Sequence, residues 1–243
     1  ASGLIGEGRL SEPETIAGYL EAFLHSETQL EGRVLITAGP TYEHLDPVRY
    51  LGNHSSGKMG FSIAKAALSK GYAVELIAGP SKEELVHPNL KRHDVISANE
   101  MLVKVEELWD TCHYGIFSAA VADYRPAEKS SNKIKKNEGE INMPLIKNPD
   151  ILSWASAHRK NKQKVIGFAL ETNNEEENAL TKLESKNLDM IVLNSTQDDQ
   201  ATFGGDLNKV TIFDKNKNKT EFPLKSKLDI GFELINLIST IVQ

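Results

Sequence analysis

Short apolar runs alternate along most of the chain with segments in which apolar residues recur at helical spacing. Apolar runs bounded by turn residues predict strands, and the helical spacing predicts helices between them. The predicted strands span residues 33–38, 73–78, 114–118, 165–169 and 190–193. The predicted helices span residues 58–70, 98–110, 151–158, 175–186 and 228–242, preceded by one from 11 to 23. This alternation is typical of an α/β fold, a mostly parallel sheet with helices on both faces.

Three segments depart from the alternation. Residues 209–213 and 220–224 flank the polar sequence DKNKNK, which predicts an antiparallel hairpin. Residues 123–149 are polar and lysine-rich without a helical period, which indicates a long functional flap. Residues 25–32 are typical of a linker, so we divide the chain into an N-terminal piece, 1–32, and one α/β domain, 33–243.

Composition narrows the function classes. A net charge of −6 over 243 residues argues against a nucleic-acid-binding protein, which would have a basic surface. The single cysteine, Cys112, rules out an internal disulfide and is expected to pack as an apolar residue beside Trp109. There is no apolar run near 18 residues and no signal-peptide pattern. We therefore expect a cytoplasmic protein without a membrane segment.

The loop before the helix at residue 58 is a candidate anion site. Gly52 to Lys58 matches G-x-x-x-x-G-K, but Met59 lacks the metal-binding hydroxyl of a P-loop, and about a dozen residues separate the loop from the strand at 33–38. The chain has no G-x-G-x-x-G motif either. Ser55 and Ser56 offer capping hydroxyls at a helix N-terminus, where a phosphate would meet free N–H groups. The alternative is a well-capped helix that binds nothing.

Arg49 and Asn53 lie in the same loop. Arginine offers a fork suited to phosphate or carboxylate, and asparagine donates to an oxyanion and accepts from an amine. Each residue type also commonly stabilises a loop without any catalytic role.

Three further groups are candidates for a nucleotide site. Asp123 follows the strand at 114–118, where the sheet's carboxyl edge forms a crevice, although it is equally suited to a turn paired with Arg125. Lys133 begins the K-I-K-K run of the flap and would stabilise a triphosphate, although such a run is usually solvated. Lys182 and Lys186, spaced i and i+4, project from one helical face.

The motifs also match a known family. ITAGPT, DPVRY, NHSSGKMG, AAVADYRP, KIKK, KNPDIL, GFALET, KNLDMIVLN and FGGDLNKVTIF occur in order and closely resemble bacterial phosphopantothenate–cysteine ligase. The resemblance covers nearly everything from Val34 to the C-terminus. It implies a Rossmann-like sheet and an enzyme that uses CTP to convert 4′-phosphopantothenate into an acyl-cytidylate. L-Cysteine then attacks, giving 4′-phosphopantothenoylcysteine and CMP on the route to coenzyme A. It also implies Mg²⁺ with the nucleotide, and a homodimer.

The resemblance assigns roles to residues. Asn53 resembles the asparagine that handles the acyl-cytidylate, Arg49 the arginine that binds phosphopantothenate, and Lys133 the lysine needed to form the intermediate. The matching positions of the CTP pocket are Phe117, Ser118, Ala119, Asp123, Pro149, Asp150, Ile151, Leu152, Phe168, Lys182 and Lys186. The metal ligands stay unknown. Gly52 departs from the pattern, since serine is common before the asparagine, and is expected to loosen the loop.

The N-terminus carries a second, shorter resemblance. ASGLIGEGRLSEPETI resembles the end of phosphopantothenoylcysteine decarboxylase, a flavoprotein often fused ahead of this ligase, with Ser2 where its proton-donating cysteine would stand. With so little of that domain present, no FMN site is expected here. The resemblance implies the ligase half of a bifunctional protein that forms higher oligomers when fused.

Two other function classes stay open at this level. One is a nicotinamide-dependent oxidoreductase on the same kind of sheet, which the missing glycine fingerprint disfavours. The other is a non-catalytic nucleotide-binding module.

Overall fold

The computed structural model describes residues 13–24, 32–135, 141–160, 162–195 and 205–240. The decarboxylase-like N-terminus with Ser2, most of the predicted linker, Lys136 of the lysine run and the end of the C-terminal helix lie outside the described residues. The division at residue 32 stays a prediction. The first helix, α1, spans Pro13–Leu24.

The core of the protein is one sheet of eight strands. Its parallel strands are β1 (Arg33–Ala38), β4 (Ala73–Ala78), β5 (Leu90–Asp94), β6 (Tyr114–Phe117), β9 (Lys164–Glu171) and β10 (Met190–Ser195). The antiparallel strands β12 (Val210–Asp214) and β13 (Lys219–Glu221) complete one edge. The strand order is β13-β12-β10-β9-β6-β1-β4-β5. The parallel part therefore has the order of a doubly wound Rossmann sheet, which confirms the predicted fold class.

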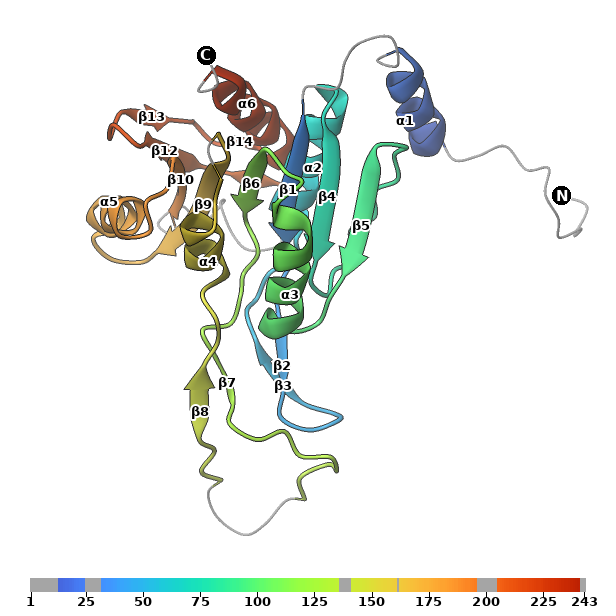
Figure 1. The fold of residues 1–243 in the computed structure, drawn as a ribbon. Coiled ribbons are helices and arrows are strands. Elements are labelled where there is room, and N and C mark those ends of the chain that lie inside the picture. The colour runs from blue at the N-terminus through green and yellow to red at the C-terminus, as the bar shows by residue number, and fades with distance from the viewer. Residues whose placement is uncertain (1–12, 25–31, 136–140, 161, 196–204, 241–243) are drawn as a thin grey trace, which may run out of the picture.

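Helices cover both faces of this sheet (Figure 1). They are α2 (Lys58–Ser69), α3 (Ala98–Trp109), α4 (Ile151–Ala157), α5 (Glu175–Ser185) and α6 (Lys227–Thr240). Side chains of a strand alternate between faces, so β1 buries Val34 and Ile36 against α2 and α6, and Leu35 against the other helices. Cys112 and Trp109 are buried in the same cluster on that second face, as predicted.

Local residues account for two of the helix ends. Ser97 caps α3 by accepting from the Glu100 N–H at 3.3 Å, and the Glu100 carboxylate accepts from the Ile96 N–H at 2.7 Å. Gly71 has φ 84 beyond the end of α2, the left-handed conformation expected of a C-terminal glycine.

Two segments predicted as irregular contain hairpins. The loop after β1 holds the antiparallel pair β2 (Tyr42–His44) and β3 (Tyr50–Gly52), and the flap holds the pair β7 (Tyr124–Pro126) and β8 (Leu145–Lys147). Both hairpins extend beyond the carboxyl edge of the sheet (Figure 1). We call them together the arm. Gly52 lies in β3, where a Cβ would come within 2.9 Å of Thr41 and Tyr42, so it fits a close packing site and does not simply loosen a loop.

The other differences are small. The structure adds the short pair β11 (Leu207–Asn208) and β14 (Lys225–Ser226), and the sequence prediction did not include β5. Strands β9 and β10 are longer than predicted, and the C-terminal hairpin is shifted by one residue or more.

Candidate active site

The main cleft lies where the strand order of the sheet reverses. Helix α2 follows β1 on one face and α4 follows β6 on the other, so the loops after these two strands separate at their carboxyl ends. This is the usual ligand crevice of an open α/β sheet. The cleft has a volume of about 1040 Å³. It is therefore large enough for a nucleotide together with a second small molecule.

The loop after β6, residues 118–124, forms the floor of the cleft and is held by side chains from both sides. Thr37 Oγ1 accepts from the Ala119 N–H at 3.3 Å, and Thr41 Oγ1 accepts from the Ala122 N–H at 3.0 Å. The Asn148 amide donates to the Ala122 carbonyl at 2.8 Å from the opposite side. A loop fixed in this way is a rigid platform for a ligand.

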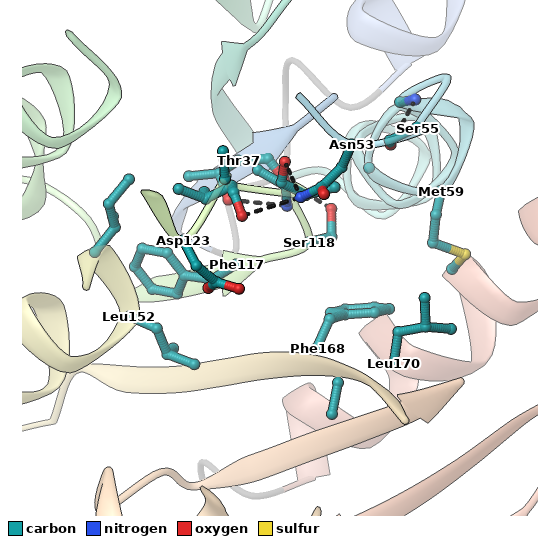
Figure 2. Close-up of a pocket in the computed structure, with 18 of the residues that line it drawn as sticks. Thr37, Asn53, Ser55, Met59, Phe117, Ser118, Asp123, Leu152, Phe168 and Leu170 are labelled. Carbon is teal, nitrogen blue, oxygen red and sulfur yellow. Dashed lines mark hydrogen bonds between the residues drawn. The ribbon is translucent and has the colours of Figure 1, made fainter. Parts of the chain in front are cut away.

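Asn53 fastens this loop to the β2–β3 hairpin (Figure 2). Its Nδ2 donates to the Ala120 carbonyl at 3.2 Å and to the Val121 carbonyl at 3.1 Å. Because two carbonyl oxygens require the NH₂ group on that side, the orientation of the amide is settled. The Asn53 Oδ1 is consequently left as a hydrogen-bond acceptor at the cleft.

The N-terminus of α2 forms a second wall. The N-cap is Gly57, with φ 85, so no side chain makes the N-cap hydrogen bond. Both serine hydroxyls still serve this helix end, because Ser55 Oγ accepts from the Gly57 N–H and Ser56 Oγ from the Lys58 N–H, each at 3.4 Å. The predicted serine hydroxyls are thus found there, but in these long contacts and not at the N-cap position. A P-loop is also excluded, because the hairpin β2–β3 stands between β1 and this loop. Lys58 pairs with Asp206 at 2.6 Å, and this hydrogen bond raises the pKa of the Lys58 ammonium.

The third wall carries two lysines from the α5 region, each paired with a carboxylate. Lys182 pairs with Glu171 at 2.6 Å, and Lys186 with Asp150 at 2.7 Å. Burial works to raise the pKa of Asp150, but hydrogen bonds from Lys186 and the Ser153 N–H outweigh it and hold that pKa below its usual value. These lysines therefore sit on salt bridges of modest strength that an anionic ligand can rearrange.

Apolar side chains complete the lining. Phe117, Leu152, Phe168, Leu170 and Met59 surround the cleft in Figure 2. Flat aromatic rings beside polar loops suit a molecule with one planar and one charged end.

Asp123 lies on the same loop, with its carboxylate exposed in the cleft. It does not pair with Arg125, whose guanidinium donates to the Lys147 carbonyl at 2.7 Å and to the Asn148 Oδ1 at 3.1 Å. The alternative of a turn-forming Asp123–Arg125 pair is therefore wrong. Within the part of the chain that the structure describes, no cluster of three or more His, Cys, Asp or Glu side chains forms a metal site.

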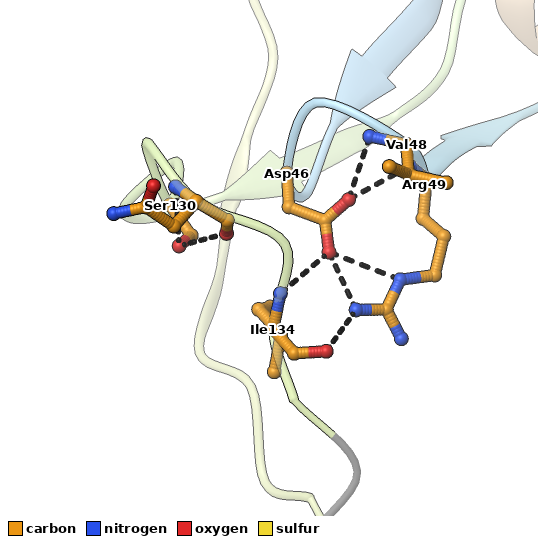
Figure 3. Close-up of polar contacts among 6 residues, drawn as sticks. Asp46, Val48, Arg49, Ser130 and Ile134 are labelled. Atoms are coloured by element: carbon orange, nitrogen blue, oxygen red, sulfur yellow. Dashed lines mark hydrogen bonds and ion pairs between the residues drawn. The ribbon is translucent and has the colours of Figure 1, made fainter.

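The cleft brings together nearly all of the predicted site residues. Those that line it are Asn53, Phe117, Ser118, Ala119, Asp123, Pro149, Asp150, Ile151, Leu152, Phe168, Lys182 and Lys186. Arg49 and Lys133 do not line it. They lie in the arm, where Arg49 pairs with Asp46 at 2.5 Å (Figure 3).

Several lining residues were not predicted. Asn208 donates from its amide to the Asn194 Oδ1 at 3.0 Å, and both residues line the cleft. Lys227, at the start of α6, also lines it; burial and the nearby Lys58 lower the pKa of its ammonium. Asn194 follows a predicted strand at the carboxyl edge of the sheet, a signal that was available. Asn208 and Lys227 reach the cleft because of the way the C-terminal region folds. No local sequence pattern predicts their position.

Similarity to known proteins places the chain in a family. A family model of the DNA/pantothenate metabolism flavoprotein C-terminal domain matches residues 30–242. The chain belongs to this family. A coenzyme A biosynthesis bifunctional protein CoaBC of Haemophilus influenzae is 47% identical over 240 residues, 98% of this chain and 59% of that protein. A cysteine/cysteine sulfinic acid decarboxylase of an unknown prokaryotic organism is 43% identical over 248 residues, 100% of this chain and 69% of that protein. The chain thus spans about three fifths to two thirds of these relatives.

Solved structures agree with the family. The crystal structure of the C-terminal domain of CoaBC has a TM-score of 0.74 at 37% identity and covers 88% of this chain and 96% of that one. The structure of a Cab2 mutant in complex with phosphopantothenate-cysteine has a TM-score of 0.72 at 16% identity, covering 94% and 92%. The second likeness supports the fold alone. Together with the relatives, the first confirms the relationship expected from the motifs. None of the described helices is long and apolar enough to cross a membrane.

Proposed function

We propose that this domain is a CTP-dependent ligase of coenzyme A biosynthesis that joins 4′-phosphopantothenate to L-cysteine. Relatives named for coenzyme A biosynthesis support the pathway. The Cab2 structure crystallised with phosphopantothenate-cysteine shares the fold, and the substrate class is proposed from the resemblance of the motifs. The observation that carries the proposal is that Asn53, the rings of Phe117 and Phe168, and the lysines Lys182 and Lys186 line one and the same cleft.

The proposed reaction has two steps. The substrate carboxylate attacks the α-phosphorus of CTP, forming an acyl–phosphate bond and releasing pyrophosphate. The amine of L-cysteine then attacks the acyl carbon, CMP leaves, and the amine loses a proton. Both steps develop negative charge on phosphate oxygens, which nearby ammonium groups stabilise.

The nucleotide is proposed to occupy the side of the cleft that α5 borders. The 118–124 loop offers backbone groups to a base, Phe168 offers a flat face, and Lys182 and Lys186 offer charge to ribose or phosphate oxygens. Residues 149–152 close this side, with Asp150 held by Lys186. CTP selectivity would then come from the backbone groups of these loops.

The acyl group is proposed to react beside Asn53. Since the Asn53 NH₂ group is committed to two carbonyls, its free Oδ1 is suited to accept a hydrogen bond from the attacking amine. That contact would orient the cysteine amine toward the acyl carbon. This gives Asn53 a role in the second step rather than in the first.

Two further positive charges are proposed to come from the arm. Lys133 is proposed to reach the triphosphate, and Arg49 the phosphopantothenate, by movement of the arm or by its contact with another subunit. Mg²⁺ usually binds nucleotides through phosphate oxygens and only one or two carboxylates, and Asp123 at the cleft fits such a site. The ion would neutralise phosphate charge when bound.

A homodimer is proposed from the surface of the arm. Val48, Tyr50, Tyr124, Leu145 and Ile146 are exposed there and lie on both hairpins. Exposed apolar side chains grouped on an extension are typical of a contact with a second copy. Light scattering should give a dimer that Ile146→Asp shifts toward the monomer; a monomeric parent protein would refute the proposal. Fusion to a flavin-binding decarboxylase would build a higher oligomer.

The direct test is product formation. The protein is incubated with 4′-phosphopantothenate, L-cysteine, Mg²⁺ and one of CTP, ATP, GTP or UTP, and mass spectrometry follows amide and nucleoside monophosphate. We expect equimolar 4′-phosphopantothenoylcysteine and CMP, with CTP preferred. Tight CTP binding without product would favour a non-catalytic module, and hydride transfer to a nicotinamide would favour an oxidoreductase.

A further inference from the structure

A buried carboxylate joins the two hairpins of the arm. Asp46, in the turn between β2 and β3, has no exposed surface although it belongs to neither apolar cluster of the core. Its Oδ1 accepts from the N–H groups of Val48 and Arg49 at 2.8 and 2.9 Å. Its Oδ2 accepts from Arg49 Nε at 3.0 Å and Nη2 at 2.5 Å, and from the Ile134 N–H at 3.1 Å (Figure 3). Every strong acceptor position of this carboxylate is therefore used.

The contacts join segments up to 88 residues apart in sequence and engage both backbone polar groups of one residue, Ile134. The Ile134 N–H donates to Asp46, and the Ile134 carbonyl accepts from Arg49 Nη2 at 2.8 Å. A second attachment lies just before it, because the Ser130 N–H donates to the Leu45 carbonyl at 2.9 Å. We call these contacts of residues 45–49 with residues 130–134 the clasp.

Lys133 lies between the two attachments of the clasp. Its neighbours at 130 and 134 are tied to the β2–β3 turn, so its backbone is fixed relative to that hairpin. Its side chain is exposed, and its ammonium makes no ion pair or hydrogen bond with any residue that the structure describes. The clasp thus holds the backbone of Lys133 and leaves its charge available.

We propose that Asp46 is a positioning residue that presents Lys133 for the reaction through the clasp. The inference rests on the proposed function, in which Lys133 stabilises the triphosphate during the first step. It also gives Arg49 a structural duty, because one edge of its guanidinium is already used to hold Asp46 and Ile134. A lysine that must reach a phosphate from a long arm benefits from such preorganisation.

The chemistry explains why the position needs a carboxylate. An asparagine has one carbonyl oxygen, so its NH₂ group would face either the two backbone N–H donors or the Arg49 and Ile134 donors. One of these sets would lose its acceptor and meet a donor instead. Asp46→Asn is therefore expected to open the clasp while keeping the size of the side chain.

The experiment measures the first half-reaction, pyrophosphate release from CTP and 4′-phosphopantothenate, in a double-mutant cycle. The four proteins are the parent, Asp46→Asn, Lys133→Ala and the double variant. We expect Asp46→Asn to slow release at least tenfold with an unchanged KM for CTP. If Asp46 acts through Lys133, the double variant is no slower than Lys133→Ala. If the rate reductions of Asp46→Asn and Lys133→Ala multiply in the double variant, the proposal is overturned.

A second readout follows the clasp without any chemistry. Hydrogen exchange of peptides covering residues 129–135 should be slow in the parent and at least tenfold faster in Asp46→Asn, with exchange in α2 unchanged. Asp94→Asn is the matched control, since it breaks the exposed Asp94–Arg92 pair of 2.8 Å on β5 and should change neither rate nor exchange. Equal protection at 129–135 in the parent and Asp46→Asn would contradict the clasp.

Arg49→Lys keeps the inference testable should Asp46→Asn fail to fold. Lysine retains the positive charge but lacks the two-pronged guanidinium donor. Arg49→Lys should therefore speed amide hydrogen exchange at residues 129–135. Its effect on the rate of pyrophosphate release should not add to that of Lys133→Ala. A rise in KM for 4′-phosphopantothenate with normal exchange would instead assign Arg49 to substrate alone and overturn the clasp. If the parent releases no pyrophosphate at all, the proposed function fails, whereas the exchange experiment still decides whether the clasp exists.

Discussion

Asn53→Asp is the substitution that most sharply separates the two proposed chemical steps. The change preserves the shape of the side chain but replaces its NH₂ group with an oxygen. In the structure that group donates to the Ala120 and Val121 carbonyls at 3.2 and 3.1 Å. The variant would therefore lose both hydrogen bonds and bring a carboxylate against two carbonyl oxygens.

The size of the effect follows from these contacts. Each net hydrogen bond contributes about 0.5–1.5 kcal/mol, so loss of the pair weakens the attachment of the 118–124 loop by about 1–3 kcal/mol. Since about 1.4 kcal/mol corresponds to a factor of ten, misplacement of the reacting groups should slow the second step about 5- to 150-fold. The first step should change less, because Lys182 and Lys186 still hold the nucleotide, although the 118–124 loop proposed to face its base is loosened as well.

Rapid quenching with mass spectrometry provides the assay. With CTP, 4′-phosphopantothenate and L-cysteine present, Asn53→Asp should accumulate the acyl-cytidylate, which the parent protein converts. Asn216→Asp, the same change on the exposed β12–β13 turn, is the control and should behave like the parent. Equal slowing of pyrophosphate release and amide formation in Asn53→Asp would refute the assignment of this residue to the second step.

Four further outcomes follow from the environments of Cys112, Gly79 and Lys186. Burial raises the pKa of the Cys112 thiol to about 11, so iodoacetamide at pH 8 should label it only in denaturant; labelling in the native protein would contradict its placement. The stability that the neutral thiol contributes should be complete below the unfolded pKa of about 8.5 and lost as pH rises toward 11, a trend that thermal melts can follow. Gly79→Ala should lower the free energy of unfolding by on the order of 1–3 kcal/mol or more, because a Cβ would meet the Pro40 carbonyl at 1.8 Å; an unchanged urea midpoint would refute this. Lys186→Gln should raise the KM for CTP about tenfold but cost less than about 1 kcal/mol of stability, since its pair with Asp150 is partly exposed, and an unchanged KM would remove Lys186 from the nucleotide site.

The main strands and helices of the sheet were predictable because their sequences have a clear hydrophobic pattern. Buried parallel strands such as β1 and β4 are mostly apolar, with Thr37 and Glu75 as buried exceptions, and the helices of the sheet have clear helical spacing. The edge strand β5, with the sequence LKRHD, carries charges instead of an apolar run and so gives no such signal. The strands of the arm are three residues each, too short for any pattern to specify.

The candidate site divides along the same line. Residues at the carboxyl ends of predicted strands, such as Asp123, reach the cleft as the α/β architecture requires. Arg49 does not line the cleft, because the buried acceptor Asp46 lies three residues away and holds its guanidinium. The sequence indicates that a charged residue lies near a site, but only the folded structure shows which group it pairs with. Lys227 illustrates the converse, since the fold of α6 brings it to a cleft formed mainly by distant segments.

In the proposed reaction, CTP activates the carboxylate of 4′-phosphopantothenate before cysteine takes part. Pyrophosphate release measured with CTP, Mg²⁺ and 4′-phosphopantothenate, and without cysteine, tests it most directly. We expect a burst approaching one pyrophosphate per site, followed by amide formation when cysteine is added. Pyrophosphate release that begins only after cysteine is added would contradict it.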